Sequence, residues 1–255
     1  MTPYARRGVH GQTVETLARR VLSGEIPEGA TLDLVSLQGE LDVSLTALRE
    51  SLKVLAAKGM VDARQKRGTF VRPRSDWNLL DADVLRWQFT GSTGAGTDLA
   101  LLRNLSEVRG IIEPAAVRLA AERRTDADLD ALEVALTAMG EDEGGAAHAV
   151  EADLAFHRAL LAATHNELLE RMEMVIESGL AHRDEIVHSS LHGEDPVPSH
   201  RAVLDAVRDQ DPETAERAMR ALLAQAVRDL DRVHGSESGT GPATTGDTPG
   251  GSSAQ

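Results

Sequence analysis

The chain has 255 residues, which is enough for one large domain or two smaller ones with a buried core. Only 2% of the residues are aromatic whereas 41% are hydrophobic, so the core must consist mainly of Leu, Ala and Val. The absence of cysteine excludes disulfides and cysteine-based zinc sites. The sequence contains no run of about 18 apolar residues, which is the length needed to cross a membrane. No apolar stretch follows Arg6 and Arg7, as it would in a secretory signal. We therefore expect a cytoplasmic protein without a membrane partner.

The net charge of −14 conceals two regions of opposite sign. Residues 1–75 contain 12 Lys and Arg against 8 Asp and Glu, a net charge of +4, whereas residues 76–255 contain 15 against 33, a net charge of −18. A basic module that meets a polyanion, joined to an acidic body that does not, would produce this asymmetry. A charge of +4 is also ordinary for a solvated surface, so the order of the elements has to decide between these interpretations.

Three helices are predicted in the N-terminal region, over residues 14–22, 35–41 and 44–58. Their apolar residues recur at the spacing of an amphipathic helix, and Asp33 and Ser44 suit the N-caps of the second and third helices. Two β-prone runs then flank a basic tip at residues 65–68, which indicates a β-hairpin. Three helices followed by a hairpin is the order of a winged helix-turn-helix, which we expect to occupy residues 1–73.

The remainder of the chain is predicted to be helical. Residues 74–96 form an interdomain connector with a short helix over residues 81–88, and further helices are predicted over residues 97–124, 126–139, 147–164, 167–189, 199–209 and 212–233. Residues 235–255 contain no large apolar group and are predicted to be a disordered tail. The expected fold class is mainly α, with the winged helix-turn-helix followed by an all-helical bundle over residues 97–234 that binds ligand and dimerises.

One face of the third predicted helix carries side chains that suit the major groove of DNA, because Arg can bind guanine bidentately and Ser or Thr can reach base edges or phosphate. The basic hairpin tip could contact phosphates in the same way. The candidate DNA-binding residues are Ser44, Thr46, Arg49, Lys53, Lys66, Arg67, Gly68 and Thr69. The same residues could form an ordinary solvated surface or bind protein, so these alternatives stay open on the residues alone.

Several stretches, in the same order along the chain, resemble the GntR family of bacterial repressors. The stretches that resemble its DNA-binding domain are VSLTALRESL (43–52), LAAKGMV (55–61) and RGTFV (67–71). Those that resemble the effector-binding domain of its FadR subfamily include LSEVR (105–109), EADLAFH (151–157) and SHRAVLDAV (199–207). The connector DWNLLDADVLRW (76–87) is similar to that of sugar-acid (galactonate-operon) repressors.

This resemblance implies a DNA-binding transcriptional regulator that acts as a homodimer. Such a repressor would bind an inverted-repeat operator in double-stranded DNA and would leave it when a small carboxylate, such as the sugar acid galactonate, binds the helical domain. The chain departs from the family at Leu45, where Arg is usual after the Ser that opens the recognition helix. A missing guanidinium removes one contact to DNA, which would change affinity or operator choice.

A candidate metal site follows from three residues. Asp153 and His157 are four residues apart and therefore share one face of a helix, and His200 begins another helix. Many members of the family add a further His at the position of Leu222, which cannot bind a metal. We therefore leave two alternatives open: a divalent metal, most plausibly zinc, held by three ligands, and a polar pocket without metal.

The resemblance also implies a set of effector-binding residues, Arg109, Asp153, His157 and His200. An Arg fork at position 109 could bind a carboxylate bidentately, or it could form an i, i+4 salt bridge with Glu113. The alternative function is that of a metal-dependent hydrolase or lyase that uses the same Asp and two His residues. No His-Glu-x-x-His pair, phosphate-binding Gly-rich loop or G-x-S-x-G motif supports catalysis.

Overall fold

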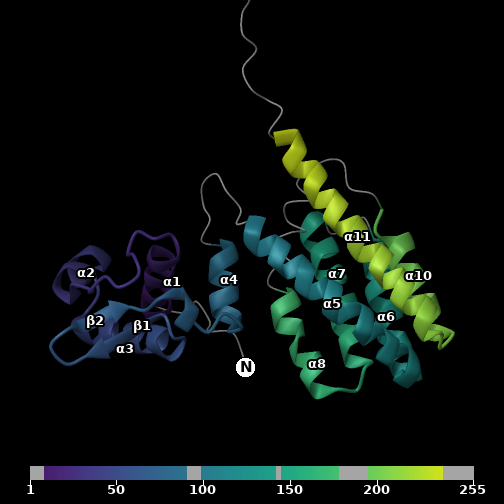
Figure 1. Ribbon diagram of the computed structural model, residues 1–255, viewed down its shortest axis with the longest axis horizontal. Helices are drawn as coiled ribbons and strands as arrows, with labels where there is room; N and C mark the ends of the chain where they lie inside the picture. Colours follow the sequence, from purple (N-terminus) through teal and green to yellow (C-terminus); the bar gives the residue numbers. More distant parts are fainter. Residues whose placement is uncertain (1–8, 91–98, 142–144, 178–194, 238–255) are drawn as a thin grey trace, which may run out of the picture.

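The computed structural model describes residues 9–90, 99–141, 145–177 and 195–237 of the chain. Figure 1 shows two lobes, a small one that contains the hairpin and a larger one that is entirely helical. The N-terminal elements are α1 (Val9–Leu22), α2 (Leu34–Leu41), α3 (Leu45–Ala57), β1 (Val61–Arg64), β2 (Gly68–Val71), the short 3-10 helix η1 (Arg74–Asp76) and α4 (Ala82–Thr90). The C-terminal elements are α5 (Leu99–Arg123), α6 (Asp126–Met139), α7 (Gly145–Ala162), α8 (Glu167–Arg171), α10 (Val197–Arg208) and α11 (Pro212–Glu237). The expected fold class is confirmed.

The caps predicted for the second and third helices are both present. The Asp33 carboxylate accepts hydrogen bonds from the backbone N–H groups of Val35 and Ser36 at 2.9 and 3.2 Å, and the Ser44 hydroxyl accepts one from Ala47 at 3.1 Å. Each cap satisfies N–H groups that a helix cannot bond internally. The two helices of the helix-turn-helix therefore begin where their local sequence dictates.

The wing is an antiparallel hairpin that has a third, very short partner. Strands β1 and β2 pair in register from Val61 opposite Val71 to Arg64 opposite Gly68. The segment before α2 also lies along β2, with the Gly29 N–H bonded to the Val71 carbonyl at 2.9 Å. The turn residues of that segment gave no sign of this pairing. These extra backbone hydrogen bonds attach the wing to the helical core of its lobe.

Helix α4 belongs to the cores of both lobes. Val84 and Trp87 are buried with the residues of α1 and α3 in the N-terminal core. Leu85 and Phe89, on the same helix, pack against leucines of α5 in the C-terminal lobe. The region expected to be a connector between the lobes is therefore an ordered part of the hydrophobic core, and Figure 1 shows α4 between the two lobes.

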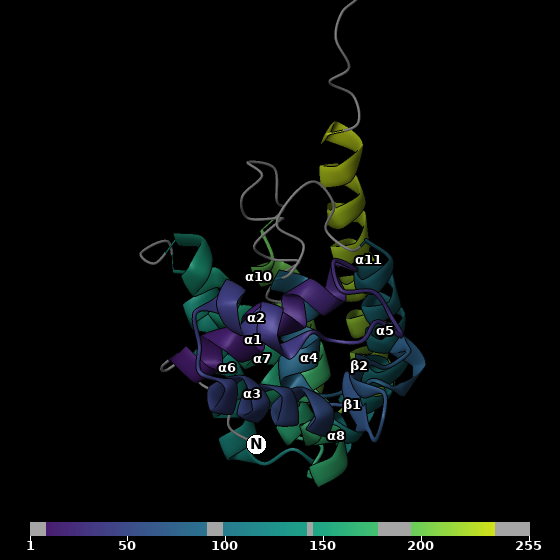
Figure 2. The same cartoon turned by 90° about the vertical axis from the view of Figure 1, so that its left-hand side faces the viewer.

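The larger lobe is a helical bundle with a core formed by α5, α6, α7, α10 and α11. Helices α5 and α11 run side by side in both views (Figures 1 and 2), and α6 packs against α7. The helix predicted over residues 167–189 is wrong as one continuous element, because α8 ends at Arg171 and Met172 forms a turn before helical residues 173–177. Residues 178–189 of that prediction lie outside the described residues. No helix in the described ranges combines the length and the apolar character needed to span a membrane.

Helix α11 continues to Glu237, three residues into the segment predicted to be a disordered tail. The rest of that segment, residues 238–255, lies outside the described residues. Since no apolar side chain is available there, the extension does not enlarge the core.

Candidate functional site

The recognition helix α3 presents the predicted polar face to solvent. Thr46 and Arg49 are exposed, and so is Lys53, whose Nζ lies 2.7 Å from Glu50. The opposite face is buried in the core through Leu48, Ser51, Leu52 and Leu55. An ion pair between two exposed side chains is weak, so Lys53 can exchange Glu50 for a phosphate at little cost. The Ser44 hydroxyl caps the helix by accepting the Ala47 N–H, so any contact of Ser44 with DNA would lie at the start of the helix.

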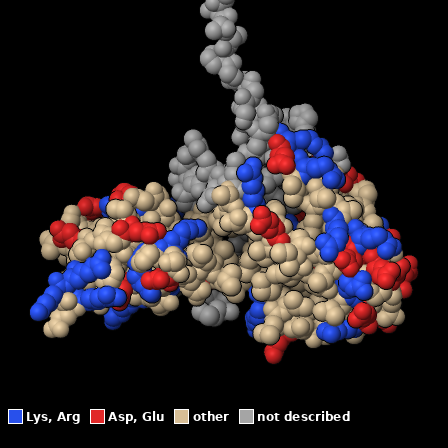
Figure 3. All heavy atoms as spheres, in the orientation of Figure 1, with Lys and Arg blue, Asp and Glu red and all other residues tan. Residues whose placement is uncertain are grey.

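The wing tip carries Lys66, Arg67 and Gly68, which differ in backbone conformation and in side-chain contacts. Lys66 lies at the tip with φ of 71° and Gly68 follows with φ of 77°. Arg67 is stacked on the Phe70 ring at 3.6 Å from its centroid and donates to the Gly29 carbonyl at 3.1 Å. Thr69 is half-buried beside them. Figure 3 shows Lys and Arg side chains gathered at the outer end of this lobe.

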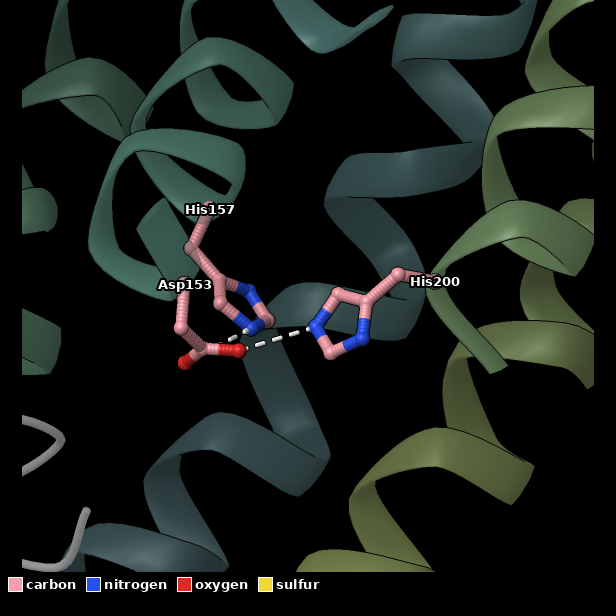
Figure 4. A group of neighbouring side chains, drawn as sticks. All are labelled: Asp153, His157 and His200. Carbon is pink, nitrogen blue, oxygen red and sulfur yellow. Dashed lines mark ion pairs between the residues drawn. The ribbon is translucent and has the colours of Figure 1, made fainter. Parts of the chain in front are cut away.

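The three candidate metal ligands meet in the larger lobe (Figure 4). Asp153 and His157 come from α7 and His200 from α10, and one ligand atom of each lies within 4.8 Å of the others. His200 Nε2 lies 2.9 Å from Asp153 Oδ1 and His157 Nε2 lies 3.9 Å from Asp153 Oδ2. All three side chains are buried. The i, i+4 spacing and the second helix therefore place these groups together as predicted.

Each histidine is oriented by an acceptor on its far side. His200 Nδ1 lies 2.8 Å from the Pro196 carbonyl oxygen, and His157 Nδ1 lies 3.0 Å from Glu113 Oε2. An acceptor at Nδ1 favours the proton on that nitrogen and leaves the lone pair on Nε2, which is how metal-binding histidines are held in proteins. Two imidazole nitrogens and one carboxylate form a donor set that suits Zn²⁺. A metal at His157 Nε2 would take the place of the Arg109 Nη2, which lies 3.1 Å from that nitrogen.

Arg109 is joined to this group through Glu113. Of the two roles left open for Arg109, the i, i+4 salt bridge is present, with Arg109 Nε 2.5 Å from Glu113 Oε1, and Arg109 Nη2 also lies 3.1 Å from His157 Nε2. Burial by itself would raise the pKa of Glu113, but the Arg109 guanidinium and His157 outweigh it and lower that pKa to about 2. Only the salt bridge could be expected of Glu113 from the sequence, because nothing local shows that His157 faces it.

A cavity of about 510 Å³ opens beside the three ligands. Its walls include Asp153, His157, His200, Ser199, Leu222, Gln225, Arg228 and Asp229. Leu222 thus faces the cavity at the position where the family resemblance places a fourth ligand. Arg109 instead lines a smaller cavity of about 240 Å³ between α5 and α11, so its guanidinium reaches the larger cavity only past His157.

Comparisons with known proteins agree with this architecture. The model of the bacterial regulatory proteins of the gntR family matches residues 10–71, and that of the FCD domain matches residues 104–225. The galactonate operon transcriptional repressor of Escherichia coli K12 is 34% identical over 225 residues, which cover 86% of this chain and 96% of that protein. The HTH-type transcriptional repressor NanR of Klebsiella aerogenes is 28% identical over 226 residues, 87% of this chain and 85% of that one.

A solved structure of a Listeria monocytogenes protein that controls the expression of the agr system has the same fold. It superimposes with a TM-score of 0.63 at 18% identity, covering 89% of this chain and 98% of that one. These relatives are regulators, so the chain is a transcriptional regulator and not an enzyme, and the hydrolase or lyase alternative is not favoured. Its N-terminal region matches the gntR family and its C-terminal region matches the FCD domain. The chain therefore belongs to the GntR family of bacterial transcriptional regulators, in its FadR subfamily.

Proposed function

We propose that this regulator is a homodimeric repressor that leaves an inverted-repeat operator when a small carboxylate enters the larger cavity. The observation that carries the proposal is the convergence of Asp153, His157 and His200 on a cavity of about 510 Å³. That cavity lies in the lobe that shares α4 with the DNA-binding lobe. Two winged domains related by a two-fold axis would read two half-sites, whose spacing follows from the dimer.

A divalent metal, most plausibly zinc, would be held by the same three residues. Asp153, His157 and His200 are buried, and one ligand atom of each lies within 4.8 Å of the others. A carboxylate and two imidazoles form a donor set that suits a divalent cation. Leu222 offers no donor atom, so coordination positions stay available to water or to an effector oxygen. The metal would supply the positive charge that an acid needs in this acidic lobe.

The effector class that fits best is a sugar acid. The name of the Escherichia coli relative points to galactonate, and the cavity wall combines the metal ligands with hydroxyl, amide and charged side chains. An aldonate offers a carboxylate to the metal and several hydroxyls to such a wall. A cavity lined in this way suits a polyhydroxylated acid better than an apolar one.

The shared helix α4 provides the route from the cavity to DNA. Leu85 and Phe89 contact α5, which carries Glu113 and thereby touches His157. A shift of α5 on ligand binding would move α4 and, with it, the core beneath the recognition helix. Release requires only that the ligand favour a dimer geometry that no longer matches the half-site spacing, by a few kcal/mol.

The test uses the full chain and a DNA site selected from random duplexes. We expect binding that weakens steeply with added salt, as phosphate contacts require, and that is released by galactonate when zinc is present. The variant His200→Ala should keep its affinity for the selected DNA and lose the response to galactonate. DNA binding that ignores galactonate in the presence of zinc would contradict the effector class, and salt-independent binding would favour a protein partner in place of DNA.

A further inference from the structure

The larger cavity has a second polar region, along α11, that the metal site does not use. Leu222, Gln225 and Asp229 all line it, and their spacing of three and four residues puts them on one stripe of the helix. A helix rises about 1.5 Å per residue, so Asp229 lies about 10 Å along the axis from Leu222. The cavity therefore extends well beyond the three ligands.

This region is organised by hydrogen bonds within α11. Gln225 Nε2 donates to Asp229 Oδ1 at 2.9 Å, and Arg228 Nε donates to Gln225 Oε1 at 3.2 Å. Arg232 Nη2 lies 3.3 Å from the same Oδ1 of Asp229, whose side chain is 16% exposed. Within α11, both of these contacts to Asp229 use Oδ1, and Asp229 lines the cavity, so among the described contacts its Oδ2 is the oxygen suited to accept a hydrogen bond from a ligand.

We propose that Gln225 and Asp229 recognise the hydroxyl-bearing end of an effector whose carboxylate is held at the histidines. This inference rests on the proposed function and adds to it the length and the distal chemistry of the ligand. A carboxylate only accepts hydrogen bonds, so Asp229 pairs with a terminal hydroxyl and gains nothing from a methyl group. A second ligand carboxylate would offer it no donor.

The length of the cavity selects long acids over short ones. With carbon–carbon bonds of about 1.5 Å, a three-carbon acid held at His157 and His200 falls short of Asp229. An extended six-carbon aldonate comes within reach of it. A site built to bond a hydroxyl discriminates strongly against a ligand that lacks it, because its own polar groups are then left unpaired.

The experiment measures dissociation constants by calorimetry for the zinc-loaded full chain with galactonate, glycerate and galactarate. Glycerate has the same acid head on three carbons, and galactarate has a carboxylate in place of the terminal hydroxyl. We expect galactonate to bind at least tenfold more tightly than either of the others. Asp229→Ala, which removes the acceptor oxygens, should reduce the preference for galactonate over glycerate to about twofold, whereas Asp231→Ala, the same change at an exposed position of α11, should leave it intact.

The outcomes separate this inference from the proposed function. Equal affinity for galactonate and glycerate, or a preference that survives Asp229→Ala, would overturn the inference while leaving a carboxylate-responsive regulator. Galactarate binding as tightly as galactonate would also overturn it, since Arg228 would then be the group that meets the distal end. If none of the three acids binds, the sugar-acid proposal fails together with the inference.

Discussion

Within the described residues, one ionic cluster lies at the joint between the lobes and another lies beside the larger cavity. At the joint, Lys58 Nζ lies 2.6 Å from Asp81 Oδ1 and 2.8 Å from Asp83 Oδ2, and the half-buried Arg86 pairs with Asp83 at 2.9 Å. Asp81 also accepts the Asp83 backbone N–H at the start of α4. Each cluster connects elements that are distant in sequence, but only the cavity cluster contains histidines.

The two clusters differ in composition and in what surrounds them. The joint contains Lys, Arg and two Asp side chains, and none of the four lines either of the two cavities described above. The cavity cluster contains two histidines, and Asp153, His157 and His200 line a space large enough for a ligand. Burial of charged residues therefore does not indicate a ligand site by itself, whereas titratable side chains that line a cavity make it a candidate.

The largest effect is expected from Glu113→Gln, which breaks the cavity cluster from within. The change leaves the buried Arg109 guanidinium without its carboxylate, and loss of one partner of a buried pair costs about 3–5 kcal/mol. Chemical denaturation at neutral pH would measure the free energy of unfolding. Glu50→Gln, which breaks the exposed pair with Lys53, serves as the control and should cost about 0–1 kcal/mol. Equal losses for the two variants would contradict the assignment of Glu113 as a buried anchor.

The same variant also gives a pH prediction. Because the pKa of Glu113 falls from its ordinary 4.5 to about 2 in the folded chain, its ionisation stabilises the fold above pH 4.5. That contribution is lost as the pH drops from 4.5 toward 2. The difference in stability between the wild-type chain and Glu113→Gln should therefore narrow below pH 4.5, and a constant difference would contradict the lowered pKa.

Lys58→Met tests the joint in the same way, with an expected loss of about 3 kcal/mol because two carboxylates lose their shared cation. The two clusters should separate in a second measurement. Lys58→Met should leave zinc binding to the larger lobe unchanged, since its partners Asp81 and Asp83 lie just before α4 and in its first turn, and neither is among the contacts of the histidines. A loss of zinc affinity in this variant would show that the joint and the cavity are not independent.

Arg49→Ala tests the DNA-binding surface, which includes neither ionic cluster and consists of exposed side chains. We expect specific DNA binding to weaken by about 1–3 kcal/mol and sequence preference to relax, without a change in stability. Anisotropy titrations against selected and scrambled duplexes would measure both. An equal loss on the two duplexes would assign Arg49 to phosphate contact and not to base recognition.

Local contacts in this protein could be predicted from the sequence, whereas most contacts within the two clusters could not. Local signals predicted the caps at Asp33 and Ser44, because a side chain that bonds N–H groups two or three residues away is a short-range event. The i, i+4 spacing likewise predicted the shared face of Asp153 and His157, and it offered the pairing of Arg109 with Glu113 as one of two alternatives.

Long-range contacts left no such signal. Nothing in the sequence around Lys58 shows that Asp81 and Asp83 would return to it, so these ion pairs could not be predicted. Glu113 was missed as the partner of His157 for the same reason, because 44 residues separate them. The hydrogen bond from Arg67 to the Gly29 carbonyl, 38 residues away, likewise has no local signal, and the predicted contact of Arg67 with DNA stays a prediction.

The smallest of the predicted effects comes from Leu222→His, which would add a third imidazole to the cavity cluster. Leu222 lines the cavity beside the three ligands, so an imidazole there could complete a four-ligand set and tighten zinc binding about tenfold, or about 1.4 kcal/mol. Leu222→Met keeps the size without the imidazole and should leave zinc affinity unchanged. Competition with a chelator measures both variants. A fourth ligand also closes a coordination position, so the tighter zinc site should respond less to galactonate; tighter zinc with an unchanged response would mean that the acid does not coordinate the metal.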